Sequence, residues 1–199
     1  MTWTEKVSMR LAKRLHTEDA PYTLGQLAHG IEIFILNVIN GLALILVSAI
    51  FHIFREVMLL CCLFFLHRLV TGGVHLRSPW TCLLATVTLM VAGGFLLRHL
   101  PILPDSFARL LILGGGGFSF VINYLHAPAA HTYVPSDPIV QRRNRIIVLW
   151  MILLGCTLSI ILVGYTYLLS MTYILAILLQ SVLLMPSSFR LVSRLEKTF

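Results

Sequence analysis

The stretch Ile31-Glu-Ile-Phe-Ile-Leu-Asn-Val-Ile-Asn-Gly-Leu-Ala-Leu-Ile-Leu-Val-Ser-Ala-Ile-Phe-His-Ile-Phe54 decides the fold of this chain. It holds no Lys or Arg, one acidic residue, Glu32, and more than the roughly 20 helical residues that cross a bilayer core. A continuous apolar run excludes a transmembrane β-barrel, because barrel strands alternate apolar and polar side chains over about ten residues. The stretch therefore predicts a membrane-spanning helix.

Similar apolar runs follow along the chain. Four of them predict further spans: Trp80–Leu97, Phe107–Leu125, Ile146–Leu168 and the shorter Thr172–Met185. Another segment, Val57–Leu66, is too short to cross comfortably. It could extend through His67 to Thr71, or enter the membrane and turn back beside a Gly-Gly pair. We therefore predict an all-α, polytopic integral membrane protein with about six transmembrane or partly re-entrant helices.

Composition supports this fold class. The 199 residues are 58% hydrophobic and 12% charged, with a mean hydropathy of +0.89, whereas soluble domains are about 25% charged. We predict one membrane-embedded domain over residues 30–189, a basic amphipathic segment over 1–29 and a basic tail over 190–199. No cleavable signal peptide is expected, because the N-terminal segment contains no apolar core.

The basic residues predict which face of the membrane each loop occupies. With six crossings, one face receives twelve of the 15 Lys and Arg residues: Lys6, Arg10, Lys13, Arg14, Arg68, Arg77, Arg142, Arg143, Arg145, Arg190, Arg194 and Lys197. The other face receives Arg55, Arg98 and Arg109. Because basic loops stay cytoplasmic, we place both termini and residues 68–82 on the cytoplasmic side. Topology and anionic lipid then explain the net charge of +7, and no nucleic-acid partner is expected.

The N-terminal segment has the pattern of an amphipathic helix. Four apolar residues recur at intervals of four positions: Trp3, Val7, Leu11 and Leu15. Basic residues occupy mostly other faces, so the helix is suited to lie on an anionic membrane surface. A topology anchor and a docking platform for substrate are both compatible with this pattern.

The chemistry is concentrated in one segment, Arg68-Leu-Val-Thr-Gly72-Gly73-Val-His75-Leu-Arg77-Ser-Pro-Trp-Thr-Cys82. Charged and polar groups near lipid are costly, so they usually have a function. A cysteine nucleophile needs help to form its thiolate at neutral pH, and His75 could serve Cys82 as the base. Arg68 could favour the thiolate or bind a substrate carboxylate.

The spacing of His75 and Cys82 indicates a break in the helix between them. They are seven positions apart, which on an unbroken helix is about 10.5 Å along the axis, too far for a hydrogen bond. Pro79 disfavours a continuous helix, and Gly72-Gly73 permits a tight turn. We therefore expect His75 in a loop or re-entrant turn and Cys82 near the next helix start. The N–H groups of that start could form an oxyanion hole.

Plainer explanations exist for each residue. Taken alone, His75 is compatible with an interfacial histidine and Cys82 with a packing cysteine, but their combination with Arg68 and the glycines favours catalysis. Glu32 could orient His75, pair with Arg68 or accept a substrate cation. An acid near the start of a span is also compatible with simple exposure at the membrane interface.

The remaining cysteines, histidines and glycines predict no further site. Cys61, Cys62 and Cys156 lie in apolar runs and are expected to pack there without disulfides. The histidines show no metal-ligand spacing, so neither a metal nor another cofactor is expected. The run Gly114–Gly117 predicts close packing of helices.

The segment as a whole reads Arg-x3-Gly-Gly-x-His-x6-Cys. This pattern resembles that of the accessory gene regulator B (AgrB) family, bacterial membrane cysteine endopeptidases that mature quorum-sensing peptides. The resemblance also covers chain length, the basic N-terminus, the number of apolar segments and an Ala127-Pro128 element before a basic stretch. Glu32 stands where family members carry an acidic residue early in the first span.

The resemblance implies a membrane-embedded cysteine endopeptidase with His75 and Cys82 as catalytic residues. Its supporting residues would be Glu32, Arg68, Gly72 and Gly73. Its substrate would be an AgrD-type propeptide with an amphipathic leader, an internal cysteine and an acidic tail. Cys82 would form a thioester as the tail leaves, and the substrate cysteine would close a thiolactone ring, or a serine a lactone. Basic residues that could attract the tail are Arg77, Arg142, Arg143 and Arg145. A homodimer in the bacterial plasma membrane is also implied.

The main alternative is a non-enzymatic membrane transporter or export factor for peptides, in which Glu32 and Arg68 would line a pathway. That function predicts polar residues on several spans, whereas the later spans offer little beyond serines, threonines and Gln180. A neighbouring short reading frame for a cysteine-containing peptide with an acidic tail would favour the peptidase.

Overall fold

The structure is a computed structural model that describes residues 2–17, 20–73, 78–129 and 137–198, without the side chains of 195–198. The helices are α1 (Trp3–Leu15), α2 (Leu24–Ile50), α3 (Phe54–Thr71), α4 (Pro79–His99), α5 (Asp105–His126), α6 (Pro138–Leu162), α7 (Tyr167–Leu184) and α8 (Pro186–Thr198). Of the described helices, five are long and apolar enough to cross a membrane: α2, α4, α5, α6 and α7. The predicted all-α, polytopic membrane fold is therefore confirmed.

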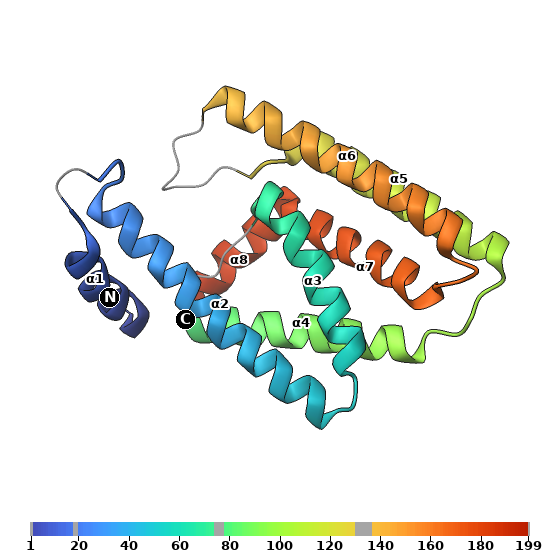
Figure 1. Ribbon diagram of the computed structural model, residues 1–199, viewed down its shortest axis with the longest axis horizontal. Helices are drawn as coiled ribbons and strands as arrows, with labels where there is room; N and C mark the ends of the chain where they lie inside the picture. The colour runs from blue at the N-terminus through green and yellow to red at the C-terminus, as the bar shows by residue number, and fades with distance from the viewer. Residues whose placement is uncertain (1, 18–19, 74–77, 130–136, 199) are drawn as a thin grey trace.

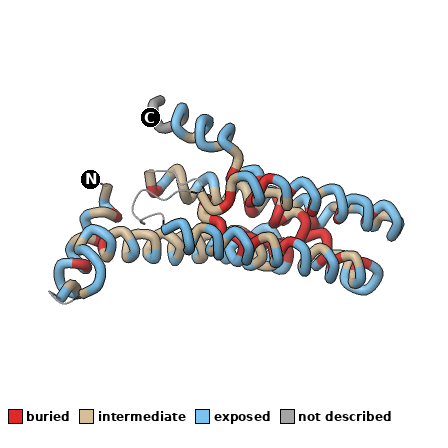
Figure 2. The backbone as a smooth tube through the Cα atoms, turned by 90° about the horizontal axis from the view of Figure 1, so that it is seen from above, coloured by how far each residue is buried: buried red, intermediate tan, exposed pale blue. Residues whose placement is uncertain are grey.

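The helix α7 lies at the centre of the bundle. In Figure 1 it runs between α3 and the α5–α6 pair, and it packs against all three. In the most apolar 18-residue stretch of α7, 56% of the residues are buried within the protein, whereas the corresponding share for α2 is 11%. Figure 2 shows the same contrast, with buried residues gathered in the bundle and few along the arm formed by α1 and α2. Polar side chains on α7 therefore face protein rather than lipid.

The helix α3 carries three charged residues, Arg55, Glu56 and Arg68, and is not among the five candidate spans. It continues through His67 to Thr71, the first of the two alternatives that the sequence left open. Its 18 residues extend about 27 Å. Because α2 to α7 alternate in direction, the end of α3 lies with the start of α4 and the α5–α6 connection toward one end of the bundle (Figure 1).

The first span begins earlier and ends earlier than the predicted range of Ile31–Phe54. It starts at Leu24, where Thr23 and Gln26 form a reciprocal capping box, and it ends at Ile50. The residues that follow Ile50 include the apolar Phe51 and Ile53 but form a turn, so their hydropathy extended the predicted span beyond the helix.

The predicted span Ile146–Leu168 is present as part of α6, but its predicted end is wrong, because the range also contains the start of the next helix. The helix α6 ends at Leu162, and α7 begins at Tyr167. The intervening turn, residues 163–166, contains Val163 and a tyrosine and carries no charge, so hydropathy did not reveal it. The division lengthens the last span to 18 residues, enough to cross a membrane.

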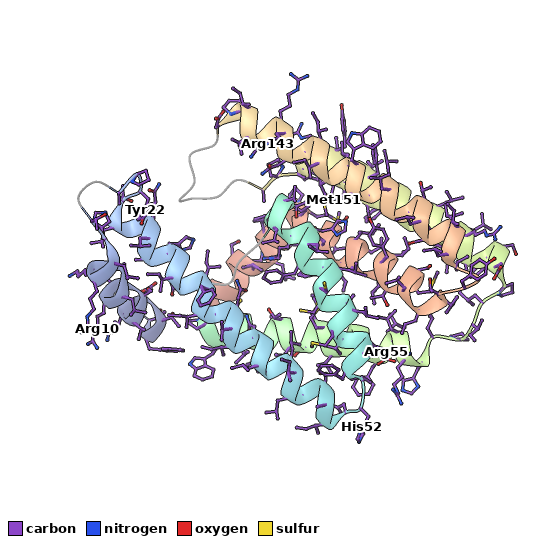
Figure 3. The ribbon with its side chains drawn as sticks, in the orientation of Figure 1. Arg10, Tyr22, His52, Arg55, Arg143 and Met151 are labelled. Carbon is purple, nitrogen blue, oxygen red and sulfur yellow. The ribbon has the colours of Figure 1, made fainter. Side chains whose placement is uncertain are left out.

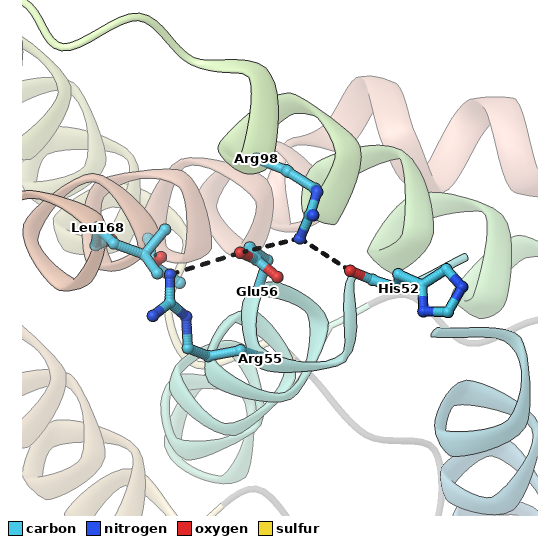
Figure 4. Close-up of polar contacts among 6 residues, drawn as sticks. His52, Arg55, Glu56, Arg98 and Leu168 are labelled. Carbon is cyan, nitrogen blue, oxygen red and sulfur yellow. Dashed lines mark hydrogen bonds and ion pairs between the residues drawn. The ribbon is translucent and has the colours of Figure 1, made fainter. Parts of the chain in front are cut away.

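Glu56 is a buried acid that the sequence alone did not single out, because it precedes the predicted apolar segment. Its carboxylate lies 3.6 Å from Arg55 and 3.9 Å from Arg98 (Figure 4). Arg98 also donates to the backbone carbonyl of His52 at 2.8 Å. This cluster joins the start of α3 to the end of α4, so it holds the two helices together at the end remote from the Gly72 turn.

The glycine run in α5 supports close packing at its two middle positions. A side chain at Gly116 would meet the sulfur of Cys156 on α6 at 2.5 Å, and one at Gly115 would meet Ile174 on α7 at 3.0 Å. The first and last glycines of the run have open space around them. The predicted role in helix packing is therefore confirmed for these two positions.

Gly155→Ala is expected to destabilise the bundle, because a Cβ at this position on α6 would overlap the ring of Tyr173 on α7. The Tyr173 hydroxyl donates to the carbonyl of Met151 at 2.7 Å and lies 3.3 Å from Nε2 of His67, so the ring is held in place. We expect a loss of about 1–3 kcal/mol in the free energy of unfolding, measured as a lower Tm in detergent. Gly114→Ala, at an open position, is the matched control, and equal Tm values for the two variants would contradict the packing role.

Candidate active site

The Gly72–Gly73 turn ends α3 and leads the chain toward α4. Gly72 has φ 65° and ψ −145°, and Gly73 has φ 142°. Residues with a Cβ rarely adopt these conformations, so both positions favour glycine, and the predicted break in the helix is present at Gly72. Residues 74–77 lie outside the described part of the chain, and with them the predicted base His75 and the predicted substrate-binding residue Arg77.

Cys82 lies in the first turn of α4, near the helix start, as predicted. The helix begins at Pro79, and the N–H of Cys82 donates to the carbonyl of Ser78 at 3.0 Å. Helical side chains lean toward the N-terminus, so the thiol points back to the helix start. The thiol is free and half-buried. Negative charge is favoured at this end of a helix by the helix dipole.

Arg68 connects the glycine turn to Cys82. Its guanidinium packs against the backbone of the turn, because a Cβ added at Gly73 would lie 2.9 Å from Nη1. The same group stacks over the ring of Phe64, with 5.8 Å between Cζ and the ring centroid. It also lies within electrostatic range of Cys82. Three residues that the sequence grouped by spacing are therefore also grouped in space.

A buried amide from α7 contacts the turn. Gln180 is 1% exposed, and its Nε2 donates to Oγ1 of Thr71 at 2.5 Å and to the carbonyl of Gly72 at 2.7 Å. A Cβ at Gly73 would lie 3.6 Å from the same nitrogen. The sequence showed Gln180 as an isolated amide in an apolar run, but it could not show a partner 108 positions away.

The connection after α5 is also joined to this turn. The N–H of Ala129 donates to the carbonyl of Thr71 at 2.8 Å. Nε of Arg145, on α6, donates to the carbonyl of Ala127 at 2.8 Å. The connection that contains Ala127-Pro128 is therefore hydrogen-bonded both to the end of α3 and to α6.

The other two arginines of the basic stretch are directed outward. Arg142 and Arg143 are exposed in the first turns of α6, which begins at Pro138 behind the N-cap Asp137. Figure 3 shows Arg143 pointing away from the body of the bundle. These two side chains are accessible to an acidic partner, whereas Arg145 bonds to the backbone of Ala127.

Glu32 contacts the N-terminal helix. Its Oε1 accepts a hydrogen bond from Oγ1 of Thr4 at 2.7 Å. The helix α1 buries a face of small residues against α2: Thr4, Ser8 and Ala12. It exposes the apolar residues of the predicted amphipathic pattern: Trp3, Val7, Leu11 and Leu15. Glu32 therefore helps to join α1 to α2, and its predicted role in orienting His75 stays a prediction.

A contact between α3, α6 and α7 lies within the bundle behind the site. His67 is 3% exposed, and its Nδ1 lies 2.9 Å from the carbonyl of Leu63. Its Nε2 is 3.3 Å from the hydroxyl of Tyr173, which donates to Met151. Because His67 immediately precedes Arg68 on α3, this contact fixes the helix that carries the guanidinium. The sequence showed a polar residue here but gave no partner for it.

The chain is similar to known proteins of one family. The family model for accessory gene regulator B matches residues 4–184. A protein described as AgrB-like from Clostridium acetobutylicum is 25% identical over 159 residues, which cover 78% of this chain and 73% of that protein. Protein FsrB of Enterococcus faecalis is 26% identical over 134 residues, which cover 65% of this chain and 53% of FsrB. No solved structure matches the chain.

The family match includes the whole segment from Arg68 to Cys82 and all five candidate spans, and it leaves out residues 1–3 and 185–199. It agrees with the resemblance that the central motif indicated. The chain therefore belongs to the accessory gene regulator B family, a peptidase family of polytopic membrane proteins that take part in quorum-sensing peptide processing.

Proposed function

We propose that this protein is a cysteine endopeptidase that removes the C-terminal tail of a quorum-sensing propeptide, with Cys82 as nucleophile and His75 as base. The observation that carries the proposal is the position of Arg68. Its guanidinium contacts the glycine turn and lies within electrostatic range of Cys82 at the start of α4. A cation beside a thiol at a helix N-terminus is the environment in which reactive cysteines occur.

The cleavage step uses groups at the start of α4. His75 takes the thiol proton, and the Cys82 thiolate attacks the carbonyl carbon before the tail. The developing oxyanion is stabilised by the N–H groups of Trp80 and Thr81, because N–H groups in a first helical turn have no partner within the helix. Collapse of the tetrahedral intermediate breaks the C–N bond, and His75 returns the proton to the leaving amine. The products of this step are the free tail and a thioester on Cys82.

The second step closes the ring without an added energy source. The substrate's internal thiolate attacks the Cys82 thioester, a new thioester forms and Cys82 leaves as thiolate. One thioester replaces another, so little bond energy is lost, and a substrate serine would give the lactone instead. Water must be kept from the acyl-enzyme during this stage, and a site at the end of a membrane bundle serves that purpose.

The substrate is an AgrD-type propeptide, and its acidic tail binds at the basic start of α6. The family supports this class of substrate, and the exposure of Arg142 and Arg143 supports the binding surface. We place this surface, the active site and both termini in the cytoplasm, because most basic residues lie in these segments. Homodimerisation stays a prediction from the family resemblance.

Joint replacement of Arg142 and Arg143 by Gln is expected to raise KM for the propeptide about threefold to tenfold with little change in kcat. Exposed charges attract a partner but do not take part in the chemical step. The difference from wild type should shrink as salt is raised, because salt screens exposed charges. KM measured across a salt series checks this, and a salt-independent loss of kcat would contradict a binding role.

The function is tested by reconstituting the purified protein in vesicles with the neighbouring cysteine-containing propeptide and analysing the products by mass spectrometry. We expect a free tail and a ring product that is one water lighter than the hydrolysed peptide. Intact propeptide transferred across the vesicle membrane without cleavage would contradict the peptidase and support the export alternative.

A further inference from the structure

Gln180 has a hydrogen-bonding pattern that a helix-packing role does not require. It is among the largest fully buried side chains, and it lies on the most buried of the candidate spans. Burial of an amide is costly unless its polar atoms are bonded, and a methionine of similar size would fill the same space without that cost. A buried polar residue in a membrane helix therefore indicates a function.

The orientation of this amide follows from its partners. The hydroxyl of Thr71 donates to the carbonyl of His67 at 3.0 Å, so it accepts from Gln180. The carbonyl of Gly72 can only accept. Both contacts therefore require the NH2 group at this position, and they use both of its hydrogens. Among the described residues, Oε1 of Gln180 is buried and has no hydrogen-bond partner.

These two bonds act on the turn that follows α3, the helix that carries Arg68. They join the C-terminal part of α7 to the last residue of α3 and to the first glycine of the turn. The next glycine contacts both Gln180 and the guanidinium of Arg68. Movement of the turn would therefore shift Arg68 relative to Cys82 as well as the start of the segment that leads to His75.

We propose that Gln180 is a positioning residue for the reaction: its amide holds the Gly72–Gly73 turn so that Arg68 stays beside Cys82. The inference rests on the proposed cysteine endopeptidase function. Gln180 itself does not touch the reacting atoms. It acts through the backbone of the turn, and its effect is on turnover rather than on binding of the propeptide.

The test compares Gln180→Met and Gln180→Glu, which keep the approximate size of the side chain and remove both N–H donors. With the reconstituted protein and propeptide, each variant is expected to lower kcat about 10-fold to 100-fold and to change KM less than about threefold. The second readout needs no propeptide. In a background with Cys61, Cys62 and Cys156 replaced by Ala, both variants are expected to slow alkylation of Cys82 by iodoacetamide.

Asn123→Leu provides the matched control for loss of a buried amide. Nδ2 of Asn123 donates to the carbonyl of Ser119 at 2.8 Å and to Oγ of Ser181 at 2.9 Å, so it joins α5 to α7 without contacting the turn. We expect it to lower Tm about as much as Gln180→Met does, with wild-type kcat and alkylation rate. Equal losses of kcat in the two variants would overturn the positioning role and leave a structural one.

The same assay separates this inference from the function on which it rests. If Cys82→Ser is inactive while Gln180→Met keeps wild-type kcat and alkylation rate, the positioning role is overturned and the peptidase stands. If Cys82→Ser still releases the tail, the proposed function fails, and the positioning role in that reaction fails with it.

Discussion

Cys82→Ser is expected to abolish release of the C-terminal tail, with a loss in kcat of at least roughly 10³-fold. A serine hydroxyl loses its proton far less readily than a thiol, and the arginine at position 68 cannot offset that difference. His75→Ala is expected to slow cleavage by about 10²-fold to 10⁴-fold, the usual contribution of a general base. Cys82→Ser should reach the membrane at wild-type levels, because the Cys82 side chain is not part of the buried core. The amount of each variant in the membrane is measured alongside cleavage, so that a loss of kcat is not confused with a loss of protein.

This prediction is checked by co-expressing each variant with the propeptide and measuring the released tail by mass spectrometry. Cys62→Ala and Cys156→Ala are the controls. Cys62 is exposed on α3 and Cys156 packs against the glycine run of α5, so neither is expected to affect cleavage. Unchanged processing by Cys82→Ser would contradict the peptidase mechanism.

Gly73→Ala is expected to have the next largest effect, a loss in kcat of about 100-fold. The added Cβ would lie 2.9 Å from Nη1 of Arg68, in a backbone conformation with φ 142° that alanine rarely adopts. Either the guanidinium moves away from Cys82 or the turn changes shape. In both cases the cation and the nucleophile lose their relative position.

Gly117→Ala is the control for Gly73→Ala. A Cβ there meets nothing within 4 Å, and alanine is the better helix former, so activity and Tm should be kept. Single-turnover cleavage with equal amounts of each protein in vesicles gives the comparison. Full activity in Gly73→Ala would show that the contact between Arg68 and the turn is not needed for the reaction.

The sequence predicted the membrane fold correctly because few backbone structures can satisfy their hydrogen bonds within the bilayer core. Long apolar runs must be helical, and basic residues must lie outside the bilayer core. The helix boundaries were less predictable. The turns after Ile50 and Leu162 contain apolar residues and no charged ones, so hydropathy did not distinguish them from the helices. The start of the first span is fixed by the capping box at Thr23, which lies outside the most apolar stretch.

The candidate site was predictable only where its residues are close in sequence. Arg68, the two glycines and Cys82 lie within one segment, and glycine and proline chemistry alone predicted a turn followed by a helix start. Gln180 and Ala129 were not predictable in this way, because their contacts with Thr71 depend on how α5 and α7 pack against α3. Hydropathy reports that a polar residue is buried but gives no partner for it.

Trapping the acyl-enzyme tests the central claim most directly. Purified protein is mixed with a propeptide whose internal cysteine is replaced by alanine, which blocks ring closure, and the mixture is quenched in acid and digested. The account predicts a hydroxylamine-sensitive adduct on the peptide that contains Cys82, together with free tail. An adduct on Cys61, Cys62 or Cys156, or no adduct in a sample that still releases the tail, would contradict it.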